Sequence, residues 1–191
     1  MDFEGAIDLA LNVADAIREV DRMDEKSKEE KCDRAYRLAF EYESKYGCCP
    51  QCVIAAIEGV FNLKMDDVFK AGHSLAGGLG LSGNGTCGAL SGGAMALSYK
   101  YGRERKNFSR GRAMKSYVLT KKLHDRFVKE FGNCICKDVQ KRIMGRSFDL
   151  WDAGEYEKFE EAGGHRDKCP DVAGKVARWV SEIILAHDGA G

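Results

Sequence analysis

No sign of charge dominates this sequence, because its 30 Lys and Arg residues balance 30 Asp and Glu residues. Without an excess of basic residues there is no global field to draw in nucleic acid or a membrane surface, and we expect neither as a partner. The first residues include Asp2 and Glu4 where a signal peptide would need Lys or Arg, and acidic residues interrupt every apolar run well short of about 18 residues. These absences predict a cytoplasmic protein.

Several well-known motifs are also missing. The sequence has no GxxxxGK[ST] phosphate loop, and its two GxGxxG matches, Gly78–Gly83 and Gly83–Gly88, lack the surrounding βαβ pattern that a dinucleotide site requires. Val53, and not His, follows the CxxC at positions 49–52, which excludes covalent haem attachment. Zinc fingers usually add a second close pair of this kind, and the CxC at positions 134–136 fits that pattern poorly.

No run of alternating β-branched residues appears, so we predict an all-α fold. Apolar residues recur at helical spacing, which indicates a compact bundle of about six to eight helices with a glycine-rich loop at Gly72–Gly93. Small residues after this loop, including Gly92 and Gly93, predict close approach of a neighbouring helix. The charged stretch 21–31 predicts a polar turn between the first two helices. Helical patterns begin near residue 3 and cover 28–45, 50–61, 66–71, 88–101, 113–131, 137–144, 155–162 and 170–187.

Cysteine is abundant, with eight residues in 191. In a reducing compartment clustered thiols serve as metal ligands or redox groups more often than as disulfides. The exception we expect is Cys32, which lies inside a helical pattern and is interpreted as a packed apolar residue.

Four cysteines precede predicted helices. The only two prolines follow Cys49 and Cys169, and proline favours the first helical position, so each of these cysteines is expected at a helix N-cap. Cys87 and Cys136 precede helices in the same way. Because the positive end of a helix dipole favours a thiolate, we expect thiol pKa values of roughly 3.5 to 7.5 at these positions. The four residues are 38, 49 and 33 positions apart, so only a packed fold could bring them together.

The same residues carry a family resemblance. "CPQCV" at 49–53, "CGALSGG" at 87–93, a cysteine after a Phe-Gly turn and a cysteine before the last helix resemble the C-GCAxxG-C-C family of redox-active proteins, over Tyr46 to Ile184. The resemblance also extends to the part of split-Soret cytochromes that carries an iron–sulfur centre, although this chain has no CxxCH for haem. It implies that the family cysteines are Cys49, Cys87, Cys136 and Cys169, with Cys134 as a substitute for Cys136.

Together these observations favour a redox-active protein, an electron carrier or oxidoreductase, in which the four family cysteines bind a [2Fe-2S] or [4Fe-4S] cluster. Cys52 and Cys134 are less favoured ligands, and backbone amides near Gly85, Thr86 and Gly88 are expected beside the cofactor. The electron partner would be another redox protein.

Two alternatives stay open. A thiol–disulfide oxidoreductase would use Cys49 as nucleophile and Cys52 as resolving residue. A structural site would hold zinc instead. His165 fits an exposed loop better than an auxiliary ligand. We expect residues 1–45 to form an N-terminal helical pair, 46–191 the four-cysteine redox domain, and the pair to mediate a possible homodimer.

Overall fold

The computed structural model describes residues 3–111 and 114–189. It is 76% helical, and within these residues it contains eight α-helices and no β-strand, which confirms the predicted all-α bundle with its glycine-rich loop. In the described part of the chain, no helix has both the length and the apolar character needed to cross a membrane. The helices are α1 Phe3–Tyr46, α2 Cys49–Phe61, α3 Asp66–Gly72, α4 Gly88–Tyr101, α5 Met114–Phe131, α6 Cys136–Met144, α7 Ala153–Glu161 and α8 Cys169–Asp188.

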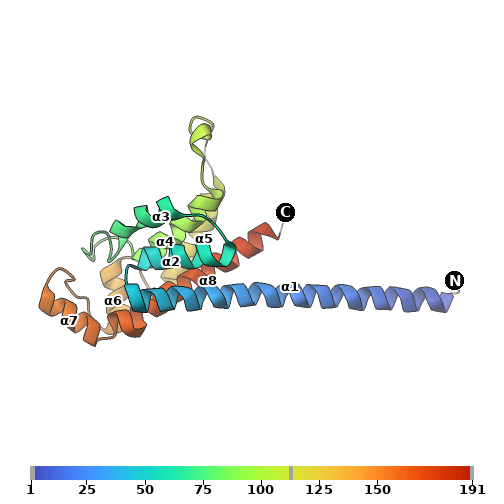
Figure 1. The fold of residues 1–191 in the computed structure, drawn as a ribbon, viewed down its shortest axis with the longest axis horizontal. Coiled ribbons are helices and arrows are strands. Elements are labelled where there is room, and N and C mark those ends of the chain that lie inside the picture. Colours follow the sequence, from blue (N-terminus) through green and yellow to red (C-terminus); the bar gives the residue numbers. More distant parts are fainter. Residues whose placement is uncertain (1–2, 112–113, 190–191) are drawn as a thin grey trace.

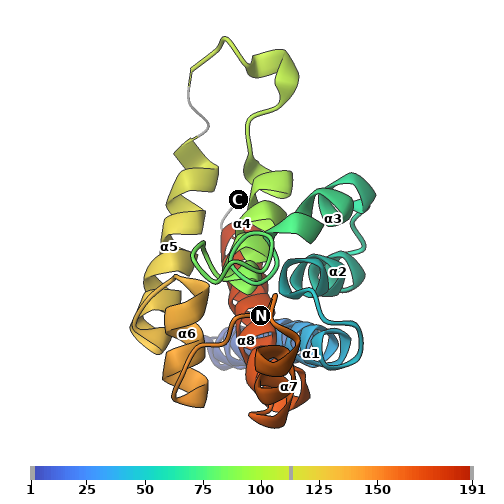
Figure 2. The ribbon, with the colours of Figure 1, turned by 90° about the vertical axis from the view of Figure 1, so that its left-hand side faces the viewer.

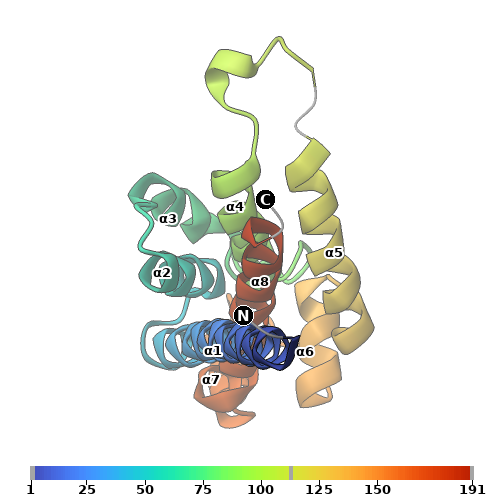
Figure 3. The ribbon, with the colours of Figure 1, turned by 90° about the vertical axis from the view of Figure 1, so that its right-hand side faces the viewer.

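Helix α8 lies at the centre of the bundle. It packs against α1, α2, α4 and α5, and α6 and α7 lie at the end of the body where α8 begins (Figures 1 and 2). Figure 1 shows α1 running past the body, with its N-terminal end projecting beyond it. The α4–α5 connection projects from the top of the body (Figure 3). The predicted start of α5 at residue 113 lies outside the described residues.

The first two predicted helices are in fact one. Helix α1 continues through the charged stretch that we interpreted as a polar turn. That stretch contains neither proline nor glycine, and Lys28 Nζ lies 2.6 Å from Asp24 Oδ2 and 2.9 Å from Glu25 Oε1. Ion pairs at these spacings support a helix, so polarity here marks a solvent-exposed face and no break.

The core forms where α8 meets its neighbours. Val176 and Val180 of α8 pack with Leu123 and Phe127 of α5, and all four are completely buried. The predicted close approach at α4 is confirmed: a Cβ on Gly92 would lie 2.5 Å from the carbonyl oxygen of Pro50. Glycine at this position therefore lets the first turn of α2 lie directly on α4 and fixes where α2 begins.

Candidate functional site

Four helices begin at one end of the body, and each begins with a cysteine. Cys49, Cys136 and Cys169 are the first residues of α2, α6 and α8, and Cys87 is the N-cap of α4. The sequence predicted that each of these four cysteines lies at the start of a helix. It also predicted that Cys49 and Cys169, which precede proline, are N-cap residues. The structure places those two cysteines one position further on, inside the first turn.

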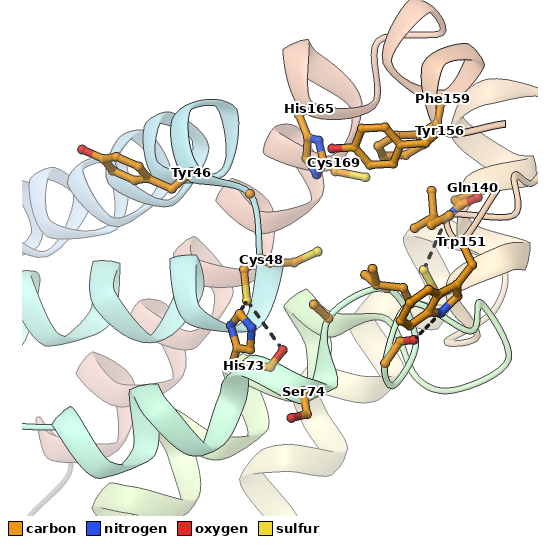
Figure 4. Close-up of a pocket in the computed structure, with 18 residues that line it drawn as sticks. Tyr46, Cys48, His73, Ser74, Gln140, Trp151, Tyr156, Phe159, His165 and Cys169 are labelled. Carbon is orange, nitrogen blue, oxygen red and sulfur yellow. Dashed lines mark hydrogen bonds between the residues drawn. The ribbon is translucent and has the colours of Figure 1, made fainter. Parts of the chain in front are cut away.

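Three of these thiols, those of Cys49, Cys136 and Cys169, line one cavity of about 450 Å³ (Figure 4). Cys87 is buried behind this wall, close enough that its charge would affect the pKa values of Cys49 and Cys169. Cys136 is likewise close enough to influence Cys87. The fold thus gathers four residues that are far apart in the sequence.

The thiols are not acidic, which contradicts the expectation from the helix dipoles. Burial raises the pKa of Cys87 to about 12 and that of Cys136 to about 11. Cys49 and Cys169 are half-buried, and loss of hydration inside the protein raises their pKa values well above that of a free thiol. Desolvation outweighs the favourable helix ends because it acts on each thiol at full strength, whereas a helix end supplies only about half a charge.

Polar groups nevertheless face two of the sulfurs. The backbone amides of Ala89 and Leu90, in the first turn of α4, donate to Cys87 and lower its pKa against the effect of burial. The Gln140 side chain donates through Nε2 to Cys136 Sγ at 3.6 Å, and its Oε1 accepts from the Phe148 amide at 3.0 Å. These donors would stabilise negative charge on the sulfurs.

The glycine-rich loop ties the second and third cysteines together. The Cys136 amide donates to the Gly85 carbonyl at 2.9 Å, the Cys87 amide donates to the Cys134 carbonyl at 2.8 Å, and Thr86 forms a β-bridge with Ile135. The Gly85 amide donates to the Gly78 carbonyl at 2.9 Å, so it is not free to reach a sulfur. Gly85 and Thr86 were expected beside the cofactor, but in the structure they connect the glycine-rich loop to the segment before α6 through backbone hydrogen bonds.

Gly88, the third position expected beside a cofactor, is the first residue of α4. A Cβ at Gly88 would lie 2.8 Å from Cδ of Pro50. Glycine here lets the start of α2 pack against the start of α4, which brings two of the cysteine-bearing helix starts together.

Five consecutive residues of this loop, Gly77 to Leu81, have positive φ angles of 58°, 75°, 71°, 56° and 61°. Left-handed backbone is usual for single glycines, and it strains leucines such as Leu79 and Leu81 by roughly 1–2 kcal/mol each. The turn brings Gly78 so close to Cys136 that a Cβ on Gly78 would lie 2.7 Å from Cys136 Cβ. The loop therefore holds Cys136 in place.

The remaining cysteines have other surroundings. Cys48 is the N-cap of α2, and its Sγ lies 3.6 Å from His73 Nδ1 at the cavity wall. Cys52 is buried on another side of α2, where its thiol donates to the Gly47 carbonyl at 2.9 Å. Cys134 packs against the core, and Cys32 is buried in α1, as predicted.

Sequence reasoning missed Glu43. Its side chain is 0% exposed, and neither carboxylate oxygen has a well-directed hydrogen bond. Burial raises the pKa of Glu43, and the nearby thiols of Cys52 and Cys49 offset this only in part. The helical pattern could have indicated that Glu43 is buried, because it lies four residues after the buried Ala39 and therefore on the same face of α1. A buried carboxyl costs free energy unless it is protonated or paired, and the basic group beside this one is the imidazole of His165.

His165 is a second departure from expectation. It lies on a short π-helical segment, Gly164–Lys168, and lines the cavity instead of projecting from an exposed loop. Its Nδ1 is 2.5 Å from Glu160 Oε1, and its Nε2 is 3.9 Å from Glu43 Oε1. The imidazole therefore connects the cavity wall to the buried carboxyl.

Among residues 3–111 and 114–189, no three Cys, His, Asp or Glu side chains are arranged to hold a single metal ion. A tetrahedral zinc ion binds all its sulfurs at about 2.3 Å, which requires a tight group. An iron–sulfur cluster binds its cysteines through different iron atoms, so its ligands are spread further apart. Cys49, Cys136 and Cys169 line one cavity and Cys87 is buried behind its wall, so the space between them is larger than a single ion needs.

The fold and the site define a helical protein with a buried four-cysteine centre. The family described as "Putative redox-active protein (C_GCAxxG_C_C)" matches residues 47–183, and the chain belongs to this family. No curated protein and no solved structure matches the chain. The family match begins after Glu43, so the carboxyl that α1 brings to the thiols lies outside it.

Proposed function

We propose that Cys49, Cys87, Cys136 and Cys169 bind an iron–sulfur cluster and that the protein transfers electrons to a redox partner protein. The observation that carries this proposal is the grouping of four thiols from four helix starts, three of them lining one cavity and the fourth, Cys87, buried behind its wall. Membership of a redox-active family supports it. When bound, the cluster would supply one-electron oxidation and reduction.

The raised pKa values favour a metal over free thiolate chemistry. Burial keeps Cys49, Cys87, Cys136 and Cys169 protonated at neutral pH, so none of them is an activated nucleophile by itself. A cation displaces these protons and pairs with the thiolates, which converts costly buried charge into metal–sulfur bonds.

The chain's own residues would tune such a centre. The amides of Ala89 and Leu90 donate to Cys87, and Gln140 donates to Cys136, which favours the more negative, reduced state. Phe159 on the cavity wall is buried and limits the access of water. A drier site strengthens every electrostatic interaction inside it.

The thiol–disulfide alternative is less well supported. Cys49 and Cys52 both have raised pKa values because of burial, and Cys52 donates its thiol proton to a carbonyl. An attacking thiol works best with a pKa near the ambient pH. The zinc alternative is less well supported because, among the described residues, no three Cys, His, Asp or Glu side chains are grouped to hold a single ion.

Anaerobic purification followed by iron, zinc and acid-labile sulfide analysis and an absorption spectrum tests the proposal. We expect a coloured protein with iron and sulfide in equal amounts, retained when Cys52 is replaced by Ser. A colourless protein that takes up neither iron nor sulfide, even after anaerobic reconstitution, would overturn it. Dithiol turnover that disappears in Cys52→Ser would instead favour the thiol–disulfide mechanism.

A further inference from the structure

The cavity is larger than a cluster requires. Its volume of about 450 Å³ lies within the range of small-molecule sites, roughly 300–1,000 Å³. The inorganic core of a [4Fe-4S] cluster has only about eight atoms, so the thiol-lined inner part would hold it and an outer part would stay free. The question is which compound that outer part fits.

Aromatic side chains form much of the outer wall. Figure 4 shows Tyr156 and Phe159 beside Cys169 on one side, Trp151 near Gln140 on another, and His73 with Ser74 across from them. The wall thus offers flat apolar faces with polar groups concentrated on one side. This is the composition expected of a site for a small, mostly apolar ligand with a few polar edges.

Trp151 is the most informative of these residues. It is 74% exposed, although its Nε1 donates to the Gly80 carbonyl at 2.9 Å and its amide donates to Asp149 Oδ1 at 3.0 Å. These bonds hold the indole in a defined position, and within the described residues no ring or cation packs on its face. A fixed, exposed tryptophan at the mouth of a cavity is a preformed stacking surface.

The strained turn supports the same surface. Gly77, Gly80 and Leu81 line the cavity, and the carbonyl that anchors Trp151 belongs to Gly80 in the middle of the left-handed run. Leu79 of this turn is 59% exposed despite its positive φ. Backbone strain of this kind persists where the surroundings impose it, and such sites are frequently ligand clamps.

Polar groups on the facing wall are available to a ligand. His73 Nδ1 donates to Gln51 Oε1 at 3.2 Å, so Nε2 of the neutral imidazole, which has no partner in the described part of the chain, is an acceptor. The Ser74 hydroxyl, on the same wall, also makes no hydrogen bond there. A planar ring with oxygen atoms at its edge would stack on Trp151, accept from the Ser74 hydroxyl and, where an oxygen is protonated, donate to His73 Nε2.

We propose that the outer part of the cavity binds a quinone-type compound, a planar ring with carbonyl oxygens at its edge, in contact with the redox centre. This inference deepens the proposed function and rests on it for the neighbouring centre. A cavity of about 450 Å³ has the size of a small-molecule site. The ring stacks against Trp151, a carbonyl oxygen accepts from the Ser74 hydroxyl, and in the reduced form a ring hydroxyl donates to His73 Nε2.

Isothermal titration calorimetry with tetramethyl-1,4-benzoquinone tests this proposal, since the four methyl groups of this probe block addition of the thiols. The protein is the anaerobically prepared, oxidised full chain. We expect saturable binding of one molecule per chain, weakened about tenfold by Trp151→Ala through loss of stacking. Phe108→Ala is the matched control, because Phe108 is equally exposed but lies on the α4–α5 connection, away from the cavity.

The two proposals fail in different ways. The absence of saturable binding, or equal affinities for the wild type and Trp151→Ala, would overturn the quinone site even if iron and sulfide are present in the same sample. Saturable, Trp151-dependent binding by a protein that takes up no iron or sulfide even after anaerobic reconstitution would support the site and overturn the cluster.

Discussion

The core between α5 and α8 and the end of the body that holds the cysteines are stabilised very differently. In the core, Phe127 and Val180 are completely buried among other apolar side chains, which is the ordinary source of folding free energy. At the cysteine end, a left-handed turn, a buried carboxyl without a directed hydrogen bond and several desolvated thiols occur together. Each of these features costs stability. The comparison indicates that the core supports an end that is shaped for function.

The largest effect on stability should come from the core. Phe127→Ala removes a completely buried ring that packs on Phe131 at 4.7 Å between centroids, and we expect a loss of about 3–5 kcal/mol in the free energy of unfolding. Trp151→Ala, at an exposed position, should change it by less than about 0.5 kcal/mol. Urea unfolding of both variants checks this difference. Equal losses would contradict the division of the molecule into a stabilising core and a functional end.

The next largest effect should follow Gly78→Ala. The new Cβ would lie 2.7 Å from Cys136 Cβ in a backbone with φ of 75°, so the loop must move away from Cys136. We expect a loss of about 1–3 kcal/mol and of most of the iron bound per folded chain. Gly80→Ala is the matched control, since Gly80 also has a positive φ but its Cβ would meet nothing within 4 Å. If both variants bind equal iron, the loop does not position Cys136.

Alkaline pH should destabilise the cluster-free protein. The folded state keeps the Cys87 proton up to a pKa of about 12, whereas the unfolded thiol loses it near pH 8.5. The Cys87 thiol therefore makes its full contribution to the free energy of unfolding below about pH 8.5. This contribution falls as the pH rises toward 12, by at most about 1.4 kcal/mol per pH unit. Urea unfolding at several pH values should show a steeper decline for the wild type than for Cys87→Ser. Parallel declines would mean that Cys87 is not desolvated in the folded state.

The smallest effect should come from the cap of α7. Asp152 accepts the Glu155 amide at 2.8 Å through Oδ1, and its replacement by Ala should cost about 1 kcal/mol without changing the iron content. Asp152→Asn, which keeps an acceptor, should lose less. A large loss of iron in Asp152→Ala would show that α7 positions the centre, and not only the outer wall of the cavity.

Local pattern was enough to predict most of the helices. Leu119, Leu123, Phe127 and Phe131 recur on one face of α5, and all are buried as expected. The exception was α1, because a charged stretch looks the same in sequence whether it forms a turn or the exposed face of a long helix. Tertiary contacts between α1 and α8 decide in favour of the helix.

The site was predicted less completely. The helix-start positions of Cys49, Cys87, Cys136 and Cys169 follow from neighbouring proline and glycine, which are local signals. Their pKa values do not, because desolvation depends on every element packed around a thiol. Glu43 was missed for the same reason: a glutamate in a helix is ordinarily exposed, and only the packed bundle buries this one.

The convergence of four sulfurs on one cofactor is tested most directly by counting iron and acid-labile sulfide after anaerobic reconstitution of single serine variants. Replacement of Cys49, Cys87, Cys136 or Cys169 should each lower both counts sharply, whereas Cys32→Ser and Cys134→Ser should match the wild type. Equal counts in all six variants, or losses confined to Cys32→Ser and Cys134→Ser, would contradict the shared centre.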